Sequence, residues 1–452
     1  MAIYIKNASF VVRSAERVER DCDLLVEGNQ IRAIGRIELP PDCHVIDGRG
    51  KAVIPGLVNA HTHLYQSFLK GMQDDVTLVD WCNEVLYPVA DIIHQDHWHR
   101  HDETIGYYWS LFGAMEMIKG GTTTCINMDM SMDAVFQAWH DIGFRGIGAI
   151  TLSDGWIPAK LRREPEVSRR DALGYAERWH GFPPDNPMLQ VMLAPSTPFL
   201  ASRDLLLWAR EQAERLGLRL QIHVAETRYE VERIQSQTGM TPVAYLDSLG
   251  LIDEGFVAVH CVHLTDADIE ILARRRPTIV HNPKSNMKLG SGVSPVPRLL
   301  AAGLPVALAN DGAASNDLLD MFEEMRAAAL LHKVAAEDAK AISARQVFQM
   351  ATEWGARACG INAGTLDEGK LADLAVVNLQ APHLLPMHNI VNALVYCAKS
   401  SDVEATIING RLVMENRRIT TLDETEVLRR GSEVGQDLCQ RSRGSELYIP
   451  RA

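Results

Sequence analysis

The chain has 452 residues, of which 46% are hydrophobic and 23% charged, ordinary values for a globular protein with a large core. Its formal charge of −13 argues against nucleic acid as a partner, and no stretch is long and apolar enough to cross a membrane. The first residues lack the basic and apolar regions of a signal peptide. The eight cysteines are scattered without a CxxC pair, which favours reduced thiols in the cytoplasm over a disulfide framework.

Both ends of the chain carry a β pattern. Residues 1–54 contain short apolar runs separated by turn signals such as Glu27-Gly28-Asn29, and none of them has helical spacing. The same pattern returns after residue 364, where Asn409-Gly410 is a hairpin signal. We therefore predict a small β-sandwich domain built from residues 1–54 and 365–420, followed by a peripheral, charged helical segment over 421–452.

Between residues 55 and 364, apolar runs alternate with helical stretches. Residues 204–216 carry apolar side chains at helical spacing and stop at Gly217, and Thr265 caps another helix with an acidic first turn. The candidate strands are 57–60, 122–127, 146–151, 189–194, 218–223, 256–260, 278–281 and 306–310. Eight strands alternating with helices predict an α/β protein with a parallel (β/α)8, TIM-like barrel, whose active site lies at the C-terminal ends of the strands.

Polar side chains end several of these predicted strands. His61 and His63 end the first strand, and their spacing of two places both imidazoles on one side. His223 ends the fifth strand, His260 ends the sixth, and Asp311 follows the eighth. One histidine after an apolar run is usually a hydrogen-bonded structural residue. The whole set at one end of a barrel predicts a metal centre.

Glu226 lies three residues beyond His223, in the sequence HVAET. There it would stand beside metal-bound water, where a carboxylate can move a proton to the substrate. It could equally be a first-turn acid of the helix that begins near Thr227, and Asp311 could belong to a simple Asn-Asp-Gly turn. His263 is a weaker candidate than His260 and is more typical of a loop or capping residue.

These motifs resemble the amidohydrolase superfamily. Within it they are most similar to the aminohydrolase branch, which contains methylthioadenosine/S-adenosylhomocysteine deaminase, guanine and 8-oxoguanine deaminases and the triazine hydrolases. The resemblance extends from residue 46 to residue 374 and rests on PGLVNAHTH, HVAET, AVHCVHLT, HNPKSNMKLGSG and NDGAASND. It implies a hydrolase of carbon–nitrogen bonds other than peptide bonds, in which metal-bound hydroxide attacks a purine, pterin or triazine-like ring and ammonia leaves.

The resemblance also implies a role for each motif residue. One divalent ion, zinc in preference to iron, is expected on the ligands His61, His63, His223 and Asp311. Glu226 is expected to shuttle protons, His260 to polarise the attacking water or the tetrahedral centre, and Asp311 to take part in catalysis as well as binding. Binuclear relatives carry a bridging lysine after the fourth strand, and this chain has none there, so a single ion is implied.

Three positions depart from the pattern of methylthioadenosine/S-adenosylhomocysteine deaminases. Ser196 replaces a histidine, Ala90 a glutamate that grips ribose, and Ile150 an arginine. We therefore expect a smaller heterocycle without ribose. Deamination of either nucleoside, and removal of chloride or an alkylamine from a triazine, remain alternatives; a non-catalytic barrel scaffold is a remote one.

The predicted substrate contacts are Gln66, Trp81, Ser196 and Glu226, although Trp81 could equally be a packing residue. A loose histidine cluster before a predicted helix could suggest a second metal site, but it is more typical of an inserted loop: His94, His97, His99 and His101. We expect a small-molecule substrate, no nucleic-acid or membrane partner, and a homodimer or homotetramer.

Overall fold

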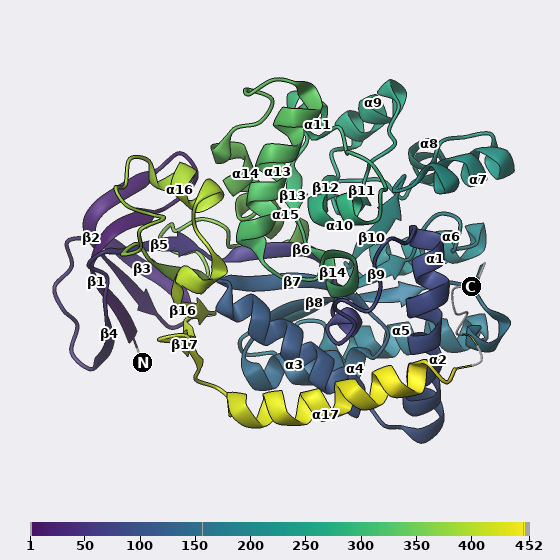
Figure 1. The fold of residues 1–452 in the computed structure, drawn as a ribbon, viewed down its shortest axis with the longest axis horizontal. Coiled ribbons are helices and arrows are strands. Elements are labelled where there is room, and N and C mark those ends of the chain that lie inside the picture. Colours follow the sequence, from purple (N-terminus) through teal and green to yellow (C-terminus); the bar gives the residue numbers. More distant parts are fainter. Residues whose placement is uncertain (1, 156, 446, 448–452) are drawn as a thin grey trace.

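The computed structural model describes residues 2–155, 157–445 and 447. These residues form two sheets of nine strands each, with a mixed sheet on the left of Figure 1 and a barrel at its centre. Part of the predicted C-terminal segment (446 and 448–452) lies outside the described residues. No described helix is both long and apolar enough to span a membrane.

The barrel strands follow one another in chain order and are parallel. They are β6 (Leu57–His63), β7 (Thr122–Asp129), β8 (Arg145–Leu152), β9 (Leu189–Pro195), β10 (Arg219–Val224), β11 (Phe256–His260), β12 (Thr278–His281), β13 (Val306–Leu308) and β14 (Asp311–Gly312). β13 pairs with β12 at one end of the sheet order, and β14 pairs with β6 at the other. Only Ala309 and Asn310 separate β13 from β14, so the sheet closes on itself and confirms the predicted α/β barrel.

Helices surround the barrel. They include α3 (Thr104–Lys119), α4 (Met132–Ile142), α5 (Pro165–Trp179), α6 (Arg203–Leu216), α7 (Arg228–Thr238), α8 (Pro242–Ser248), α9 (Asp266–Arg275), α10 (Pro283–Lys288), α11 (Val296–Ala301), α12 (Ala313–Asn316), α13 (Met321–Ala336), α14 (Ala344–Met350) and α15 (Glu353–Cys359). The two helices expected from sequence are present. α6 is capped by Ser202 and ends at left-handed Gly217, and α9 begins with a capping box between Thr265 and Asp268.

Several predicted strand boundaries differ by one to three residues, and two of the differences concern the strands that carry His61, His63 and Asp311. The first predicted strand stopped at residue 60, but β6 continues through His63 because Thr62 pairs with both β7 and β14. The last predicted strand was continuous, whereas the chain breaks between β13 and β14. The break follows from the Asn310 amide, which donates to the side chain of Asn59, and from the left-handed backbone of Asp311 (φ +63).

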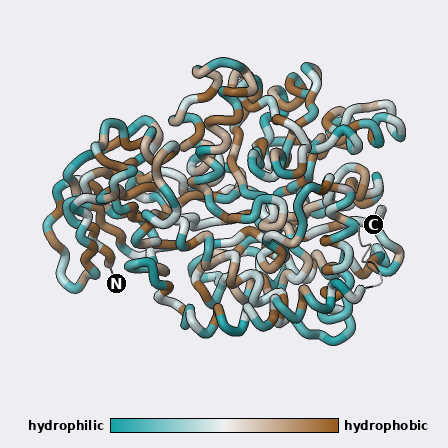
Figure 2. Tube along the Cα trace, viewed as in Figure 1, coloured by the Kyte–Doolittle hydropathy of each residue, from teal (hydrophilic) through white to brown (hydrophobic). Residues whose placement is uncertain are grey.

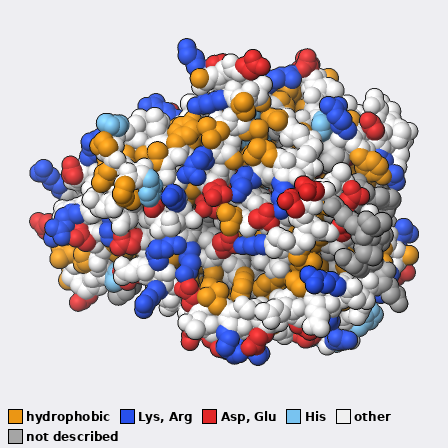
Figure 3. Space-filling model, in the orientation of Figure 1, with side chains coloured by type: hydrophobic (Ala, Val, Ile, Leu, Met, Phe, Trp, Pro, Cys, Tyr) orange, Lys and Arg blue, Asp and Glu red, His pale blue; other side chains and the backbone are white. Residues whose placement is uncertain are grey.

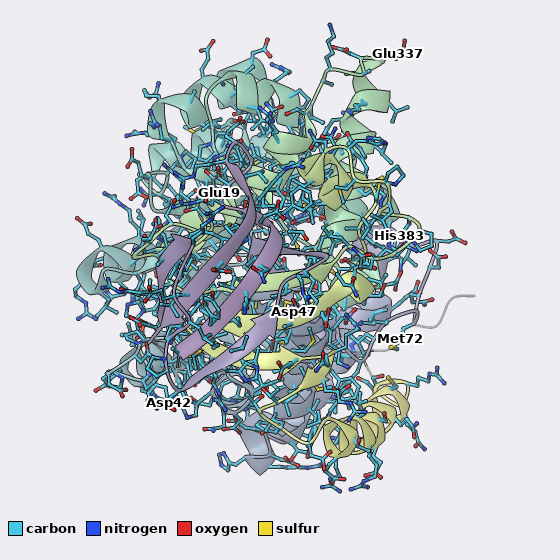
Figure 4. The ribbon with its side chains drawn as sticks, turned by 90° about the vertical axis from the view of Figure 1, so that its left-hand side faces the viewer. Glu19, Asp42, Asp47, Met72, Glu337 and His383 are labelled. Atoms are coloured by element: carbon cyan, nitrogen blue, oxygen red, sulfur yellow. The ribbon has the colours of Figure 1, made fainter. Side chains whose placement is uncertain are left out.

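The mixed sheet joins the two ends of the chain. It contains β1 (Ala2–Val12), β2 (Val18–Glu27), β3 (Gln30–Gly35), β4 (Cys43–Asp47), β5 (Lys51–Pro55), β15 (Leu374–Asn378), β16 (Val403–Ile408), β17 (Arg411–Glu415) and β18 (Arg418–Ile419). β5 pairs antiparallel with β15 along their full length. Side chains from both halves share one hydrophobic cluster. Figure 4 views this sheet face-on, with Glu19, Asp42 and Asp47 on its strands and connections.

The segment after the sheet is a helix, α17 (Glu424–Ser442), which lies along the outside of the barrel against α3 and α2 (Tyr87–Ile93) (Figure 1). Its Gly431 lies so close to Phe112 of α3 that a Cβ there would be 2.0 Å from the ring. Near its end, Arg441 forms two hydrogen bonds with the buried Asp96, at 2.6 and 2.8 Å. α17 is therefore bound to the inserted segment that carries the histidine cluster.

Hydrophobic residues concentrate in the interior of the molecule (Figure 2). Inside the barrel, alternate strand residues such as Val58 and Ala60 of β6 or Val257 and Val259 of β11 form one cluster. On the face shown in Figure 3, basic and acidic side chains are interspersed. All eight cysteines lie within the described ranges and are free thiols.

One buried ion pair connects the barrel to the mixed sheet. Arg145, at the start of β8, donates to both carboxylate oxygens of Asp373 at 2.6 and 3.2 Å and to the side chain of Asn409 at 2.9 Å. Arg145 and Asp373 are only 3% and 1% exposed at their side chains. Removal of one partner would leave the other charge buried and unpaired.

We predict that Asp373→Ala lowers the free energy of unfolding by about 3–5 kcal/mol. Glu16→Ala is the matched control, because its ion pair with Arg345 also links the mixed sheet to a barrel helix but is more than half exposed. That change should cost less than about 1 kcal/mol. Urea denaturation followed by circular dichroism measures both variants, and equal losses would contradict the prediction.

Candidate active site

Four imidazoles and one carboxylate converge at the C-terminal end of the barrel. Nε2 of His61 lies 3.2 Å from Nε2 of His223 and 3.3 Å from Oδ1 of Asp311. Nε2 of His63 lies 3.4 Å from the same oxygen. Two groups have potential ligand atoms within 4.8 Å of one another: His61, His63 and His223, and His61, His260 and Asp311. The structure therefore brings the predicted residues together.

The opposite ring nitrogen of each of three imidazoles is held by an oxygen acceptor. Nδ1 of His63 donates to the carbonyl of Met128 at 2.8 Å, and Nδ1 of His223 donates to the carbonyl of Ser196 at 2.7 Å. Nδ1 of His61 donates to Oε1 of Gln221 at 2.9 Å. Because the three Nδ1 atoms carry the hydrogens, the three Nε2 atoms present lone pairs to a common point.

Gln221 is a site residue that the sequence reasoning missed. Its Nε2 donates to the carbonyl of Ala60 at 3.1 Å, which fixes Oε1 toward His61. The signal was present, because Gln221 is a polar residue two positions before His223 on an otherwise apolar strand. Side chains two apart on a strand share a face.

The chemistry of this donor set fits a divalent metal ion. The lone pairs of His61 and His223 face each other at 3.2 Å, an arrangement that a cation between them relieves. Burial lowers the pKa of His63 to about 4 and that of His223 well below its ordinary value, which keeps both rings in the neutral form that binds metals. Three imidazole nitrogens and one carboxylate oxygen match a catalytic zinc-type site with an open position.

Asp311 is positioned by the turn that follows it. Ser285 donates to Oδ2 of Asp311 at 2.6 Å. Gln66 accepts from the Ala314 amide at 3.0 Å and packs so tightly on Gly312 that a Cβ there would lie 1.9 Å from its Oε1. Gln66, predicted to contact substrate, lines the cavity, and its Oε1 also supports the turn that follows Asp311.

Glu226 lies just beyond β10 and is 6% exposed. Its Oε1 accepts from the Ser291 hydroxyl at 3.2 Å, and its Oε2 lies 3.5 Å from Nε2 of His260. Burial and the negative charge of Asp311 together raise the pKa of Glu226 to about 8. A carboxyl with a pKa near neutral can both accept and donate a proton. Its role as a shuttle stays a prediction.

His260 differs from the other three imidazoles. Its Nδ1 lies 3.1 Å from Nδ2 of Asn282 and 3.0 Å from Nδ2 of Asn286. With the two amides in this orientation their nitrogens donate to Nδ1, which leaves the ring hydrogen of His260 on Nε2, facing Glu226 and Asp311. This tautomer suits a donor to oxygen better than a metal ligand. His263 instead bonds the Ser291 carbonyl at 2.8 Å.

A cavity of about 330 Å³ opens beside these residues. Most of its wall is aromatic or aliphatic. The residues that line the wall include all four predicted substrate contacts: Gln66, Trp81, Ser196 and Glu226. Trp81 is 4% exposed, and its indole nitrogen has no hydrogen-bond partner among the described residues. Ala90 and Ile150, two of the three departures from the nucleoside deaminase pattern, also line the wall.

The loop histidines do not form a second metal group among the described residues. They belong to η3 (His94–Arg100) and the residue after it. His97 lies 3.2 Å from the carboxylate of Glu103, and His94 packs edge-on against His99. His94 also lines the cavity, so this loop contributes to the pocket wall.

Comparison with known proteins identifies the family. The amidohydrolase family model matches residues 52–413. The chain belongs to the amidohydrolase family. A 5-methylthioadenosine/S-adenosylhomocysteine deaminase of Thermococcus sibiricus is 41% identical over 415 residues, covering 92% of this chain and 94% of the relative. A 5'-deoxyadenosine deaminase of Methanothermobacter thermautotrophicus is 40% identical over 440 residues, covering 96% and 99%.

A solved structure extends the likeness to three dimensions. An adenosine deaminase from Xanthomonas campestris with bound zinc superposes with a TM-score of 0.90 at 30% identity, covering 97% of this chain and 98% of that one. These matches confirm the predicted family and the predicted enzyme class, a hydrolase of carbon–nitrogen bonds other than peptide bonds. The family and the zinc-bound neighbour indicate a divalent metal ion in this amidohydrolase.

We predict one tightly bound divalent ion per chain. His223→Ala should lose the ion together with activity, because it removes one of three converging imidazoles. His99→Ala is the control, since His99 is an exposed histidine of the loop cluster, and it should retain the ion. Metal analysis of the purified proteins measures the number of ions per chain. Two ions in the wild type, or loss of metal from His99→Ala, would contradict the assignment of one ion to the site that contains His223.

Proposed function

We propose that this amidohydrolase is a metal-dependent deaminase that releases ammonia from an aromatic N-heterocycle of the purine, pterin or triazine type. The observation that carries the proposal is the convergence of His61, His63 and His223, with the Asp311 carboxylate 3.3 Å from His61 and 3.4 Å from His63. A buried glutamate lies beside them at an apolar cavity. Relatives named as deaminases support it. The complete residue set argues against a non-catalytic scaffold.

The chain's own residues can account for the proton transfers. A divalent ion on His61, His63, His223 and Asp311 would supply a Lewis acid that lowers the pKa of water. Glu226 takes one proton from the attacking water on Oε2, since Oε1 is bound by Ser291, and gives it to a ring nitrogen. It then takes the second proton from the added hydroxyl and gives it to the leaving amine. His260 donates from Nε2 to the oxygen that adds to the ring carbon. The carbon–nitrogen bond breaks, and ammonia leaves.

The finer parts of the proposal concern the ion and the assembly. We propose a single zinc ion, with iron as the alternative, because the donor set is nitrogen-rich.

Free thiols throughout the described chain support a cytoplasmic location. An exposed apolar patch around α13, where Leu330 is 53% and Val334 73% exposed, supports the expected homodimer or homotetramer. Sedimentation velocity of the purified chain measures its assembly state.

The cavity wall supports a substrate smaller than a nucleoside. Ala90 and Ile150 offer no polar group to ribose, and Ser196 bonds His223 through its backbone carbonyl. The relatives named as deaminases of methylthioadenosine, S-adenosylhomocysteine and 5'-deoxyadenosine favour the second candidate, deamination of such nucleosides. Removal of chloride or an alkylamine from a triazine is a third outcome that the same centre could support.

We predict that free purine, pterin or triazine-type bases are deaminated better than methylthioadenosine or S-adenosylhomocysteine. The physical reason is the missing polar contacts to ribose. An ammonia-release screen with metal-analysed enzyme compares kcat/KM across these substrates. Values for either nucleoside in the ordinary enzyme range, about 10⁴ M⁻¹s⁻¹ or above, would favour the nucleoside alternative instead.

We predict that Glu226→Gln separates proton transfer from metal binding. The variant keeps size and shape but cannot accept a proton, so metal content should stay near wild type while the rate falls by at least about 10²–10⁴-fold. Asp311→Asn is the matched comparison and should weaken metal retention as well as turnover, because it removes a charged ligand. Loss of metal from Glu226→Gln, or near-normal turnover, would show that its assigned role is wrong.

A further inference from the structure

A second buried glutamate holds the backbone that carries Glu226. Glu230 lies in the first turn of α7 and is 2% exposed. Its Oε1 accepts from the Ala225 amide at 2.7 Å, and its Oε2 accepts from the Glu226 amide at 3.0 Å. Both oxygens of one carboxylate are therefore used on two consecutive amides at the end of β10.

This contact departs from ordinary helix capping. The sequence Thr227-Arg228-Tyr229-Glu230 has the pattern of a capping box, in which the glutamate would accept from the amide of the capping residue itself. Thr227 makes its half of the capping box, because its hydroxyl accepts from the Glu230 amide at 3.2 Å. Glu230, however, bonds the two residues that precede the cap. The start of α9 shows the ordinary form, where Asp268 accepts from the amide of its own capping residue, Thr265, at 2.9 Å.

The backbone that Glu230 holds is in an unfavourable conformation. Ala225 has φ +51, a left-handed region that costs energy for a residue with a Cβ. Such a residue persists where its surroundings fix it. The Ala225 carbonyl accepts from the amides of Val262 and His263, at 3.1 and 2.9 Å, on the loop after His260. Glu230 therefore holds the amide groups of this turn, and the loop after His260 holds the Ala225 carbonyl.

We propose that Glu230 is a positioning residue that locks the left-handed turn at Ala225 and so aims the Glu226 carboxyl at Ser291 and His260. This inference rests on the proposed function, in which Glu226 moves the protons. Without Glu230 two buried amides lose their acceptor, the turn relaxes, and Glu226 moves away from the reacting atoms. The metal ligands are held by other contacts and should be unaffected.

The test combines structure and kinetics of Glu230→Gln. The two backbone amides bond different oxygens of Glu230. In glutamine an NH2 group, which only donates, replaces one of these oxygens, so one amide loses its acceptor. In crystals of the metal-loaded protein we expect the Glu226 carboxyl to leave the hydroxyl of Ser291. With the best substrate of the ammonia-release screen we expect kcat to fall by about 10²-fold, the effect of misplacing a reacting group by about 1 Å. KM and metal content should change little.

Asp268→Asn is the matched control. Asp268 is also a buried carboxylate in a helix-capping position and is 2% exposed, but it bonds no residue of the site. This variant should lose thermal stability and keep kcat, which separates loss of a helix cap from loss of positioning. Glu230→Asp is a second variant in case the glutamine variant fails to fold. It keeps the charge but withdraws the carboxylate by one methylene group, and it should show a smaller displacement of Glu226 and a smaller loss of kcat.

The crystal structure and the rate give distinct outcomes. If Glu226 moves and kcat falls, the positioning role stands. If Glu226 stays in place, the inference is overturned whatever the rate does. If Glu226 moves and kcat is unchanged, Glu230 positions Glu226 as proposed, but Glu226 is not the proton shuttle and the proposed mechanism fails instead. If no substrate in the screen is turned over, the proposed function fails, and the position of Glu226 still decides the role of Glu230.

Discussion

The backbone pairing of β14 with β6 closes the barrel and assembles the proposed metal centre in the same contact. Asp311 pairs with Thr62, the residue between the two histidines of the first strand, and the Thr62 hydroxyl donates to the Asp311 carbonyl at 2.9 Å. Residues 249 positions apart in sequence therefore meet only when the sheet closes. The break between β13 and β14 frees Asp311 from a regular strand, so its carboxylate can turn toward the imidazoles.

The surroundings of Asp311 and Glu226 shift the pKa values of these two neighbouring carboxyls in opposite directions. Burial alone would raise the pKa of Asp311, but the imidazoles of His61, His63 and His260 around it hold it well below its ordinary value. Burial and the charge of Asp311 raise the pKa of Glu226 to about 8. Two carboxyls whose pKa values are driven apart are typical of an acid–base pair. Asp311 is suited to remain a charged ligand, and Glu226 to exchange protons.

The sequence predicted the parts of this protein that depend on local patterns. Apolar runs marked the barrel strands, and the polar residues at their ends marked His61, His63, His223, His260 and Asp311. It could not show that Thr62, between the two histidines of β6, pairs with Asp311 of β14, because that contact forms only when the sheet closes. It also could not show that Glu230 reaches past its helix cap, since the local pattern is that of an ordinary capping box. Contacts set by tertiary packing, such as Gln66 on Gly312, were likewise beyond it.

The most direct test of the central claim is anomalous diffraction at the zinc absorption edge from crystals of the zinc-loaded protein. The account predicts a single peak per chain, at about 2.0–2.2 Å from Nε2 of His61, His63 and His223 and from one oxygen of Asp311. His260 and Glu226 should lie beyond bonding distance of the ion. A second peak, or an ion bonded to His260 or Glu226 in place of one of these four ligands, would contradict it.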